Sequence, residues 1–202
     1  LNCCLLLINK SFILTPQSLF IKALKHPDSR DEAFSRLVSE YKERLYWHIR
    51  KIVIDHDDAN DVVQNTFIKV HINIENFKEK SSLYTWMYRI ASNESLNFIK
   101  SKASKMGLKN QEWIESLADG LIADPHFDGD EAAIILQKQV AQLPEKQRIV
   151  FNMRYFDKMN YESISKILET SVGALKSSYH HAVKKIKIQL SKTEPTEEPN
   201  YE

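Results

Sequence analysis

Cysteine, glycine and proline are all scarce in this 202-residue chain. Its two cysteines, Cys3 and Cys4, are adjacent near the first residue and cannot cross-link a core, so a disulfide-stabilised domain is excluded and a reduced cytoplasmic location is expected. Four glycines and six prolines are too few for many short strands joined by tight turns. The apolar run 3–8 is too short to span a bilayer and has no signal-peptide features. We therefore expect no membrane insertion.

Charge is segregated along the chain although the net charge is only +1. Residues 137–192 have eleven basic and four acidic side chains, whereas residues 106–136 have one basic and seven acidic. A basic segment of this size is typical of a nucleic-acid-binding surface, although a merely solvated basic surface is the alternative. Three of the four glycines fall in 106–136, which predicts a flexible acidic linker with one short helix. Residues 193–202 have four acids and no base, and predict a disordered tail.

Helical periodicity dominates on both sides of the acidic segment. Residues 15–105 predict two helices between 18 and 54 with a break at 26–28, a third that begins at a cluster of acids, and a fourth over about 83–102. In the third helix the expected buried stripe is Ala59, Val63, Phe67, Val70 and Ile74. The fold class is therefore all-α, with two small helical domains, 15–105 and 137–192, joined by the linker.

The second domain contains a helix-turn-helix pattern. Pro144 precedes a helix over 145–156, Asn160 caps a short helix over 161–168, and a last helix follows from 172 to about 190. Its apolar stripe is Leu175, Tyr179, Ala182, Ile186 and Leu190, and its polar face is Lys176, Ser177, His180, Lys184 and Lys187. A short helix, a tight turn and a helix with one basic face suit binding in a DNA groove, although two ordinary amphipathic helices are the alternative.

A second polar stripe lies on the fourth helix of the first domain. Its members recur at steps of three and four: Trp86, Arg89, Asn93, Asn97 and Lys100. Aromatic faces, cations and amides together suit single-stranded DNA. Two other interpretations stay open, in which Trp86 belongs to the core and Arg89 pairs with Glu75 or Glu79.

No catalytic constellation is recognisable in the sequence. The acids Asp55, Asp57, Asp58 and Asp61 could suggest a metal-dependent nuclease, but they do not follow a calcium-loop pattern. Helix capping explains them better, because acids are favourable at the positive end of a helix dipole. The adjacent His180 and His181 point in different directions and have no third ligand in the sequence pattern. We expect no enzyme activity, no metal and no cofactor.

The motifs together resemble a known family. LPEKQR (143–148), VFNMRYF (150–156), YESISKIL (161–168) and SVGALKSSYHHAVKKI (171–186) are similar to region four of extracytoplasmic-function (ECF) sigma factors, in the sigma-70 family. DDANDVVQNTFIKVH (57–71) resembles region 2.2, and FKEKSSLYTWMYRIASNESLNFIK (77–100) resembles regions 2.3 and 2.4. In the loop at 78–80 the glycine usual in the family is absent.

The resemblance implies partners and roles. Region 2.2 would dock on core RNA polymerase through Asp61, Gln64 and Asn65. The following segment would melt the minus-ten promoter element and capture its non-template strand, through Tyr84, Trp86, Arg89, Asn93, Asn97 and Lys100. Region four would read the minus-thirty-five duplex through Ser171, Gly173, Lys176, Ser177, His180 and Lys184. An anti-sigma factor is a further implied partner. A self-standing helix-turn-helix regulator is the rival function, and a purely structural scaffold would not explain the segregated charge.

Overall fold

The computed structural model describes residues 16–119 and 131–193, and every regular element in these two ranges is helical. The first range contains α1 (Pro16–Lys25), η1 (Pro27–Ser29), α2 (Arg30–Val53), α3 (His56–Asn73), η2 (Ile74–Asn76), α4 (Leu83–Lys105) and α5 (Asn110–Asp119). The second contains α6 (Glu131–Ala141), α7 (Glu145–Phe151), η4 (Asn152–Phe156), α8 (Tyr161–Leu168) and α9 (Val172–Thr193). The predicted all-α class is confirmed. The tail predicted over 193–202 lies outside the described residues, apart from Thr193 at the end of α9.

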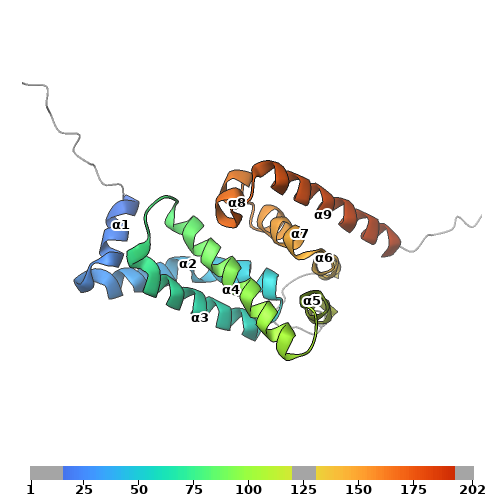
Figure 1. The fold of residues 1–202 in the computed structure, drawn as a ribbon, viewed down its shortest axis with the longest axis horizontal. Coiled ribbons are helices and arrows are strands. Elements are labelled where there is room, and N and C mark those ends of the chain that lie inside the picture. The colour runs from blue at the N-terminus through green and yellow to red at the C-terminus, as the bar shows by residue number, and fades with distance from the viewer. Residues whose placement is uncertain (1–15, 120–130, 194–202) are drawn as a thin grey trace, which may run out of the picture.

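The first domain is a bundle in which α2, α3 and α4 pack against one another and α1 closes one end of α2 (Figure 1). The stripe predicted for the third helix is buried at all five positions, of which four lie in α3 and Ile74 begins η2. Between α2 and α3 the chain turns at Ile54, whose φ of 69° is rare for a β-branched residue. The Ile54 side chain is buried in the core cluster, and this burial offsets the backbone cost of the turn.

The second domain surrounds a small cluster that consists of Val140, Leu143, Phe151, Ala182 and Ile186. The helix expected over 145–156 changes at Asn152 into a π-helical turn, η4. α8 and α9 form the predicted helix pair. Asn160 caps α8, because its side chain accepts a hydrogen bond of 2.8 Å from the Ser163 backbone N–H. Of the predicted α9 stripe, Leu175, Ala182 and Ile186 are buried.

α5 is the short helix expected in the acidic segment, and it is docked on both domains. Ile114 and Ala118 of α5 are buried, and α5 packs against α4 and α6. The buried Arg148 of α7 donates hydrogen bonds to Gln111 Oε1, 3.2 Å away, and to the Ala141 carbonyl, 3.1 Å away. Burial lowers the pKa of Arg148 to about 10. The beginning of the expected flexible linker is therefore anchored, whereas residues 120–130 lie outside the described residues.

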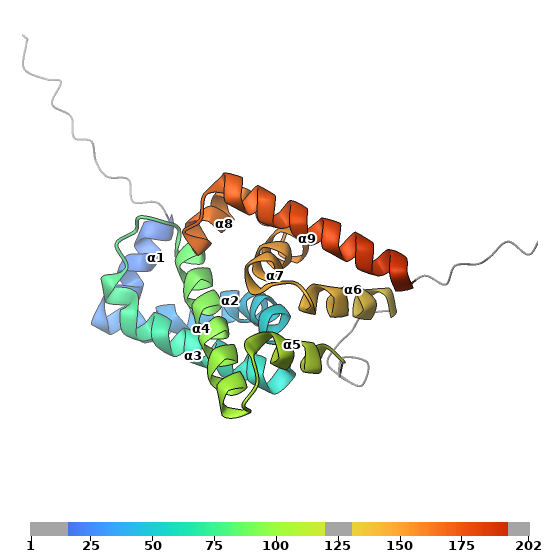
Figure 2. The same cartoon turned by 45° about the vertical axis from the view of Figure 1, so that its right-hand side comes forward.

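The two domains touch directly. α8 lies beside the first half of α4 in two views of the molecule, and η4 packs on α2 (Figures 1 and 2). One hydrophobic cluster includes residues of both domains, such as Tyr88 and Ala91 from α4 and Ile164 and Ile167 from α8. A flexible linker between two small domains does not predict this direct contact. The charge and glycine content of the linker carry no information on the apolar surface that each domain presents to the other.

Candidate polymerase and nucleic-acid interfaces

The acids at the start of α3 divide into structural and exposed groups. Asp55 is the N-cap and accepts a hydrogen bond of 2.9 Å from the Asp58 backbone N–H. The Asp58 carboxylate is buried and forms an ion pair with Lys102 of α4. Burial raises the pKa of Asp58, and the hydrogen bond and charge of Lys102 offset only part of this effect. Asp57 and Asp61 are exposed. In 16–119 and 131–193, no three His, Cys, Asp or Glu side chains are grouped as a metal site.

Asp61, Gln64 and Asn65 are all exposed and share one face of α3. Asp61 and Gln64 line an open groove of about 560 Å³ between α2 and α3, whereas Asn65 is not among its lining residues. Its other lining residues are Phe34, Val38, Lys42, Asn60, Val63, Phe67, Ile68, His71 and Ile72.

Ile68 and Ile72 extend this face and were missed in the sequence. Their side chains are 50% and 65% exposed. The spacing of Asp61, Asn65, Ile68 and Ile72 (four, three, four) places the two isoleucines on the polar face of α3, off the buried stripe. This spacing was the available signal. The two exposed isoleucines add apolar surface to the groove between α2 and α3.

Trp86 and Asn93 of α4 line a second cavity. Ser82 caps α4 by accepting a hydrogen bond of 3.1 Å from the Thr85 backbone N–H. The half-buried Trp86 ring packs on Phe77, with ring centroids 5.0 Å apart. Trp86 is therefore partly a core residue, as one of the open interpretations held. The cavity has a volume of about 270 Å³ and is lined by Lys69, Asn73, Asn76, Trp86, Ile90, Asn93 and Glu94.

The remaining predicted residues of α4 lie in different surroundings. Asn97 and Lys100 are exposed on the same side as Asn93. Tyr84 lies on the opposite side of the helix from Trp86, and its ring packs on Tyr88 with centroids 4.2 Å apart. Burial raises the pKa of Tyr84. The structure thus brings five of the six residues to one stripe and separates Tyr84 from them.

Arg89 pairs with the second domain, not with Glu75 or Glu79. Its guanidinium lies 2.7 Å from the Glu169 carboxylate and also donates to the Lys166 carbonyl. Glu75 instead pairs with Arg30, at 3.5 Å. Glu169 is the turn residue between α8 and α9, and its φ of 53° is the left-handed conformation that ends α8. Arg89 therefore contacts the turn of the helix-turn-helix.

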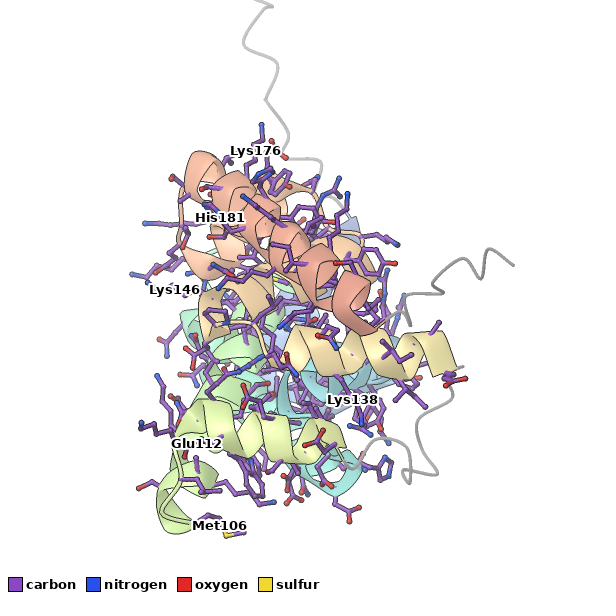
Figure 3. All side chains as sticks on the ribbon, turned by 90° about the vertical axis from the view of Figure 1, so that its right-hand side faces the viewer. Met106, Glu112, Lys138, Lys146, Lys176 and His181 are labelled. Atoms are coloured by element: carbon purple, nitrogen blue, oxygen red, sulfur yellow. The ribbon has the colours of Figure 1, made fainter. Side chains whose placement is uncertain are left out.

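The residues predicted to read the minus-thirty-five duplex, which lie on α9 and directly before it, are exposed at every position. Ser171, Gly173, Lys176, Ser177, His180 and Lys184 are all exposed. Ser171 Oγ accepts from the Ala174 backbone N–H at 3.4 Å, and the Lys176 ammonium lies 5.9 Å from the Tyr161 ring centre. α9 has no acidic residue, so this face is cationic. Lys176 lies near the top of the molecule and Met106, after α4, at the bottom in the view of Figure 3.

Gly173 has open space around it. A Cβ atom built at Gly173 meets no atom within 4 Å, so packing within the chain does not require glycine there. The start of α9 therefore has room at Gly173 for the close approach of another backbone.

No helix in the described part of the chain is long and apolar enough to cross a membrane.

Comparison with known proteins matches both domains to one family. Sigma-70 region 2 matches residues 37–105, and Sigma-70 region 4 matches residues 133–186. The chain is 29% identical over 180 residues to the ECF RNA polymerase sigma factor SigW of Bacillus subtilis. These residues cover 84% of this chain and 94% of that protein. It is also 29% identical over 170 residues to the RNA polymerase sigma-H factor of Pseudomonas aeruginosa, covering 80% of this chain and 87% of that protein.

Two solved structures share the fold. A structure of CnrH in complex with the cytosolic domain of CnrY superposes with a TM-score of 0.64 at 20% identity, covering 88% of this chain and 98% of that one. The sigma factor RpoE of Bartonella quintana, solved with the anti-sigma factor NepR, superposes with a TM-score of 0.62 at 20% identity, covering 80% of this chain and 98% of that one.

The two matched regions, their order along the chain and the helix-turn-helix geometry agree with one another, and the chain belongs to the ECF subfamily of sigma-70 family RNA polymerase sigma factors, which are transcription initiation factors.

Proposed function

We propose that this sigma factor binds core RNA polymerase, directs it to specific promoters and promotes DNA melting. The observation that carries the proposal is the presence of two separate polar faces, on α4 and on α9, in domains that match sigma regions 2 and 4. Residues 15–105 act as the polymerase-docking and minus-ten domain, residues 106–136 as the linker, and residues 137–192 as the minus-thirty-five domain. The protein acts in the cytoplasm, where polymerase and promoters are located.

Polymerase docking uses the exposed face of α3 with Asp61, Gln64 and Asn65. The groove beside it supports this assignment, because Ile68 and Ile72 add apolar area to a polar rim. Stable interfaces have this composition, with apolar residues central and polar residues around them.

Minus-ten recognition uses the α4 stripe. The cavity at Trp86 and Asn93 has an aromatic wall, and it has amides from Asn73 and Asn76 on α3 and η2. An unpaired base needs a stacking surface and hydrogen-bonding groups for its edge, and both are available here. Asn97 and Lys100 continue the path of the strand toward the end of α4. Arg89 and Tyr84 are assigned here from the family resemblance, with Arg89 available once it leaves Glu169.

Minus-thirty-five recognition uses α9. Residues at the N-terminal end of a recognition helix reach base edges, and cations further along meet phosphates. Lys176 and Ser177 therefore read bases, and Ser171, Gly173, His180 and Lys184 contact the backbone. The similar structures of CnrH and RpoE are complexes with CnrY and the anti-sigma factor NepR, which supports an anti-sigma partner for this chain.

A transcription assay tests the proposal. The purified chain and core polymerase are incubated with a promoter library, and start sites are mapped from the RNA. We expect defined start sites that depend on the chain. If the chain neither associates with core polymerase nor changes the start sites, the proposal is wrong, and binding of promoter duplex without polymerase would favour the rival regulator.

Variants separate the two DNA faces. Asn93→Ala should reduce open-complex formation more than polymerase binding. Lys184→Ala should weaken duplex binding for all sequences and lower the salt slope by about one unit. Lys176→Ala should instead cost about 1–3 kcal/mol of discrimination between bases. Equal loss of polymerase binding and melting in Asn93→Ala, or an unchanged salt slope in Lys184→Ala, would contradict the respective assignment.

A further inference from the structure

α1 and the turn that follows it lie before the segment matched by Sigma-70 region 2, which begins at residue 37. They nevertheless pack against η2 and run beside the loop that leads to α4 (Figures 1 and 2). This loop, the 77–82 loop, joins η2, which carries Asn76, to α4, which carries Trp86. Both side chains line the cavity of about 270 Å³, here called the Trp86 cavity. The conformation of the loop therefore sets how the walls of the cavity face each other.

Lys25, in the last turn of α1, makes a polar contact with this loop. Its ammonium donates a hydrogen bond of 2.7 Å to the Phe77 carbonyl, at the first residue of the loop. Phe77 directly follows η2, and carbonyls at the end of a helix have no partner within that helix. Because the donor is charged, the bond is stronger than one between neutral groups. Lys25 therefore ties the start of the loop to α1.

Arg30, at the start of α2, makes a similar contact with the end of α3. It donates a hydrogen bond of 3.1 Å to the His71 carbonyl and pairs with Glu75 of η2 at 3.5 Å. The Glu75 side chain is 52% exposed, so solvent weakens the ion pair, whereas the hydrogen bond to the carbonyl is partly buried. Two cations five residues apart thus hold the end of α3 and the start of the loop.

Apolar packing joins the same elements beneath the cavity. Ile21 and Leu24 of α1 share one buried cluster with Phe77 of the loop. Trp86 and Ile90, which line the cavity, pack against this cluster. The centroids of the Phe77 and Trp86 rings are 5.0 Å apart. Contacts therefore run without a break from α1 through Phe77 to the aromatic wall of the cavity.

The 77–82 loop needs this support because its backbone is not relaxed. Glu79 has a φ of 55°, in the left-handed region that costs energy for a residue other than glycine. Such conformations persist where the surrounding structure holds them. Lys25 holds the start of the loop at Phe77, and Ser82, whose Oγ accepts from the Thr85 backbone N–H, holds its end. Loss of the Lys25 contact therefore frees the start of the loop.

We propose that Lys25 is a positioning residue for minus-ten recognition, which fixes the 77–82 loop through the Phe77 carbonyl and so shapes the Trp86 cavity that captures an unpaired base. This inference rests on the proposed function and extends it to residues before the matched segment. Lys25 does not touch DNA but acts through Phe77 and Trp86. When the contact is lost, only a fraction of the chains has a binding-competent cavity, and the apparent affinity for the captured base falls by that fraction.

Hydrogen exchange in the free full chain tests the contact itself. The reporter is the Phe77 backbone N–H, which donates to the Ile74 carbonyl at 3.1 Å. Lys25→Met should speed its exchange about 10-fold, because a hydrogen bond from a charged donor contributes about this factor to an equilibrium. Lys22→Met, the same change at an exposed lysine one turn earlier on α1, should leave the exchange unchanged.

Two further variants keep the test decisive if Lys25→Met fails to fold, which circular dichroism would show. Lys25→Arg keeps a charged donor that can reach the same carbonyl, so it should preserve slow exchange. Arg30→Gln removes the ion pair and weakens the second carbonyl contact, and it should speed the exchange of the Phe77 N–H about threefold.

Base discrimination by the holoenzyme tests the positioning role. Core polymerase with the full chain is titrated with forked promoter duplexes whose minus-ten non-template strand is unpaired and carries one base substitution at a time. Wild type should discriminate at the position captured beside Trp86. Lys25→Met should lower this discrimination about 10-fold, while the affinities for core polymerase and for minus-thirty-five duplex stay within twofold of wild type. A general loss of stability would lower all three.

The outcomes separate this inference from the proposed function. Unchanged exchange in Lys25→Met, or faster exchange with unchanged discrimination, would overturn the positioning role and leave the function intact. An equal loss of discrimination in Lys22→Met would also overturn it, because the charge of α1 alone would then be responsible. If the wild-type chain forms no complex with core polymerase, the proposed function fails, and the inference fails with it whatever the exchange shows.

Discussion

Ile72→Ser is the substitution that best tests the polymerase-docking surface. Ile72 is 65% exposed, at the end of the groove between α2 and α3. Full burial of an isoleucine side chain is worth about 1.5–3 kcal/mol, so covering the exposed 65% is worth about 1–2 kcal/mol. The substitution should therefore raise the dissociation constant for core polymerase about 5- to 30-fold. Because little of the side chain is buried in the free chain, the melting temperature should barely change.

Fluorescence anisotropy of the labelled chain, titrated with core polymerase, measures this effect. The matched control is Leu19→Ser, which makes an equivalent change at a side chain of α1 that is 53% exposed and is not among the groove residues. If Ile72→Ser binds core polymerase within twofold of wild type, or if Leu19→Ser is equally impaired, the groove is not the docking surface.

Three further predictions concern other parts of the molecule. Gly173→Ala should stabilise α9 by up to about 1 kcal/mol, because glycine is a poor helix former and the new methyl group meets no atom. It should weaken minus-thirty-five duplex binding about 10-fold, and equal or tighter binding in a gel-shift assay would show that no DNA approaches closely. Lys102→Met leaves the Asp58 carboxylate buried without its partner, and should lower the free energy of unfolding by about 1–3 kcal/mol. Adding Asp58→Asn should restore part of this loss in urea unfolding, and simple additivity would refute the coupling. Burial alone would raise the pKa of Asp157, but the hydrogen bond and charge of His48 hold it below its ordinary value of about 4. Asp157 therefore stabilises the fold above about pH 4, and the difference in unfolding free energy between wild type and Asp157→Asn should shrink as the pH falls through the folded pKa. A constant difference between pH 6 and pH 2 would contradict this.

The helices and their buried faces could be predicted because they depend on local periodicity. All five residues of the stripe predicted for the third helix are buried, and Asn160 caps α8 as expected. Burial of an apolar stripe at a spacing of three and four residues, and capping by a side chain three residues away, are decided within one or two turns of the chain. The same holds for the helix-turn-helix, whose short helix, tight turn and long helix follow one another in sequence.

The backbone conformation of the loops was harder to predict from the sequence than the helices. The loop at 78–80 lacks the glycine usual in the family, and in the structure Glu79 has a φ of 55°, the conformation that glycine favours. A non-glycine residue at positive φ is identified only once the ends of the loop are fixed by the flanking helices. The change from α- to π-helix at Asn152 was also missed. Asn152 donates a hydrogen bond to the Lys51 carbonyl, 101 residues away in the chain, and no local pattern shows such a contact.

By itself the sequence determined the helices, the caps, the cationic face of α9 and the family, because each of these depends on residue types at short and regular spacing. Only the tertiary structure decided which side chains meet across the domains. Asp157 contacts His48 over a separation of 109 residues, and Arg89 contacts Glu169 where the sequence offered Glu75 or Glu79. Many carboxylates are available to any one cation in a sequence, and the apolar contact that brings two domains together selects the one that is within reach.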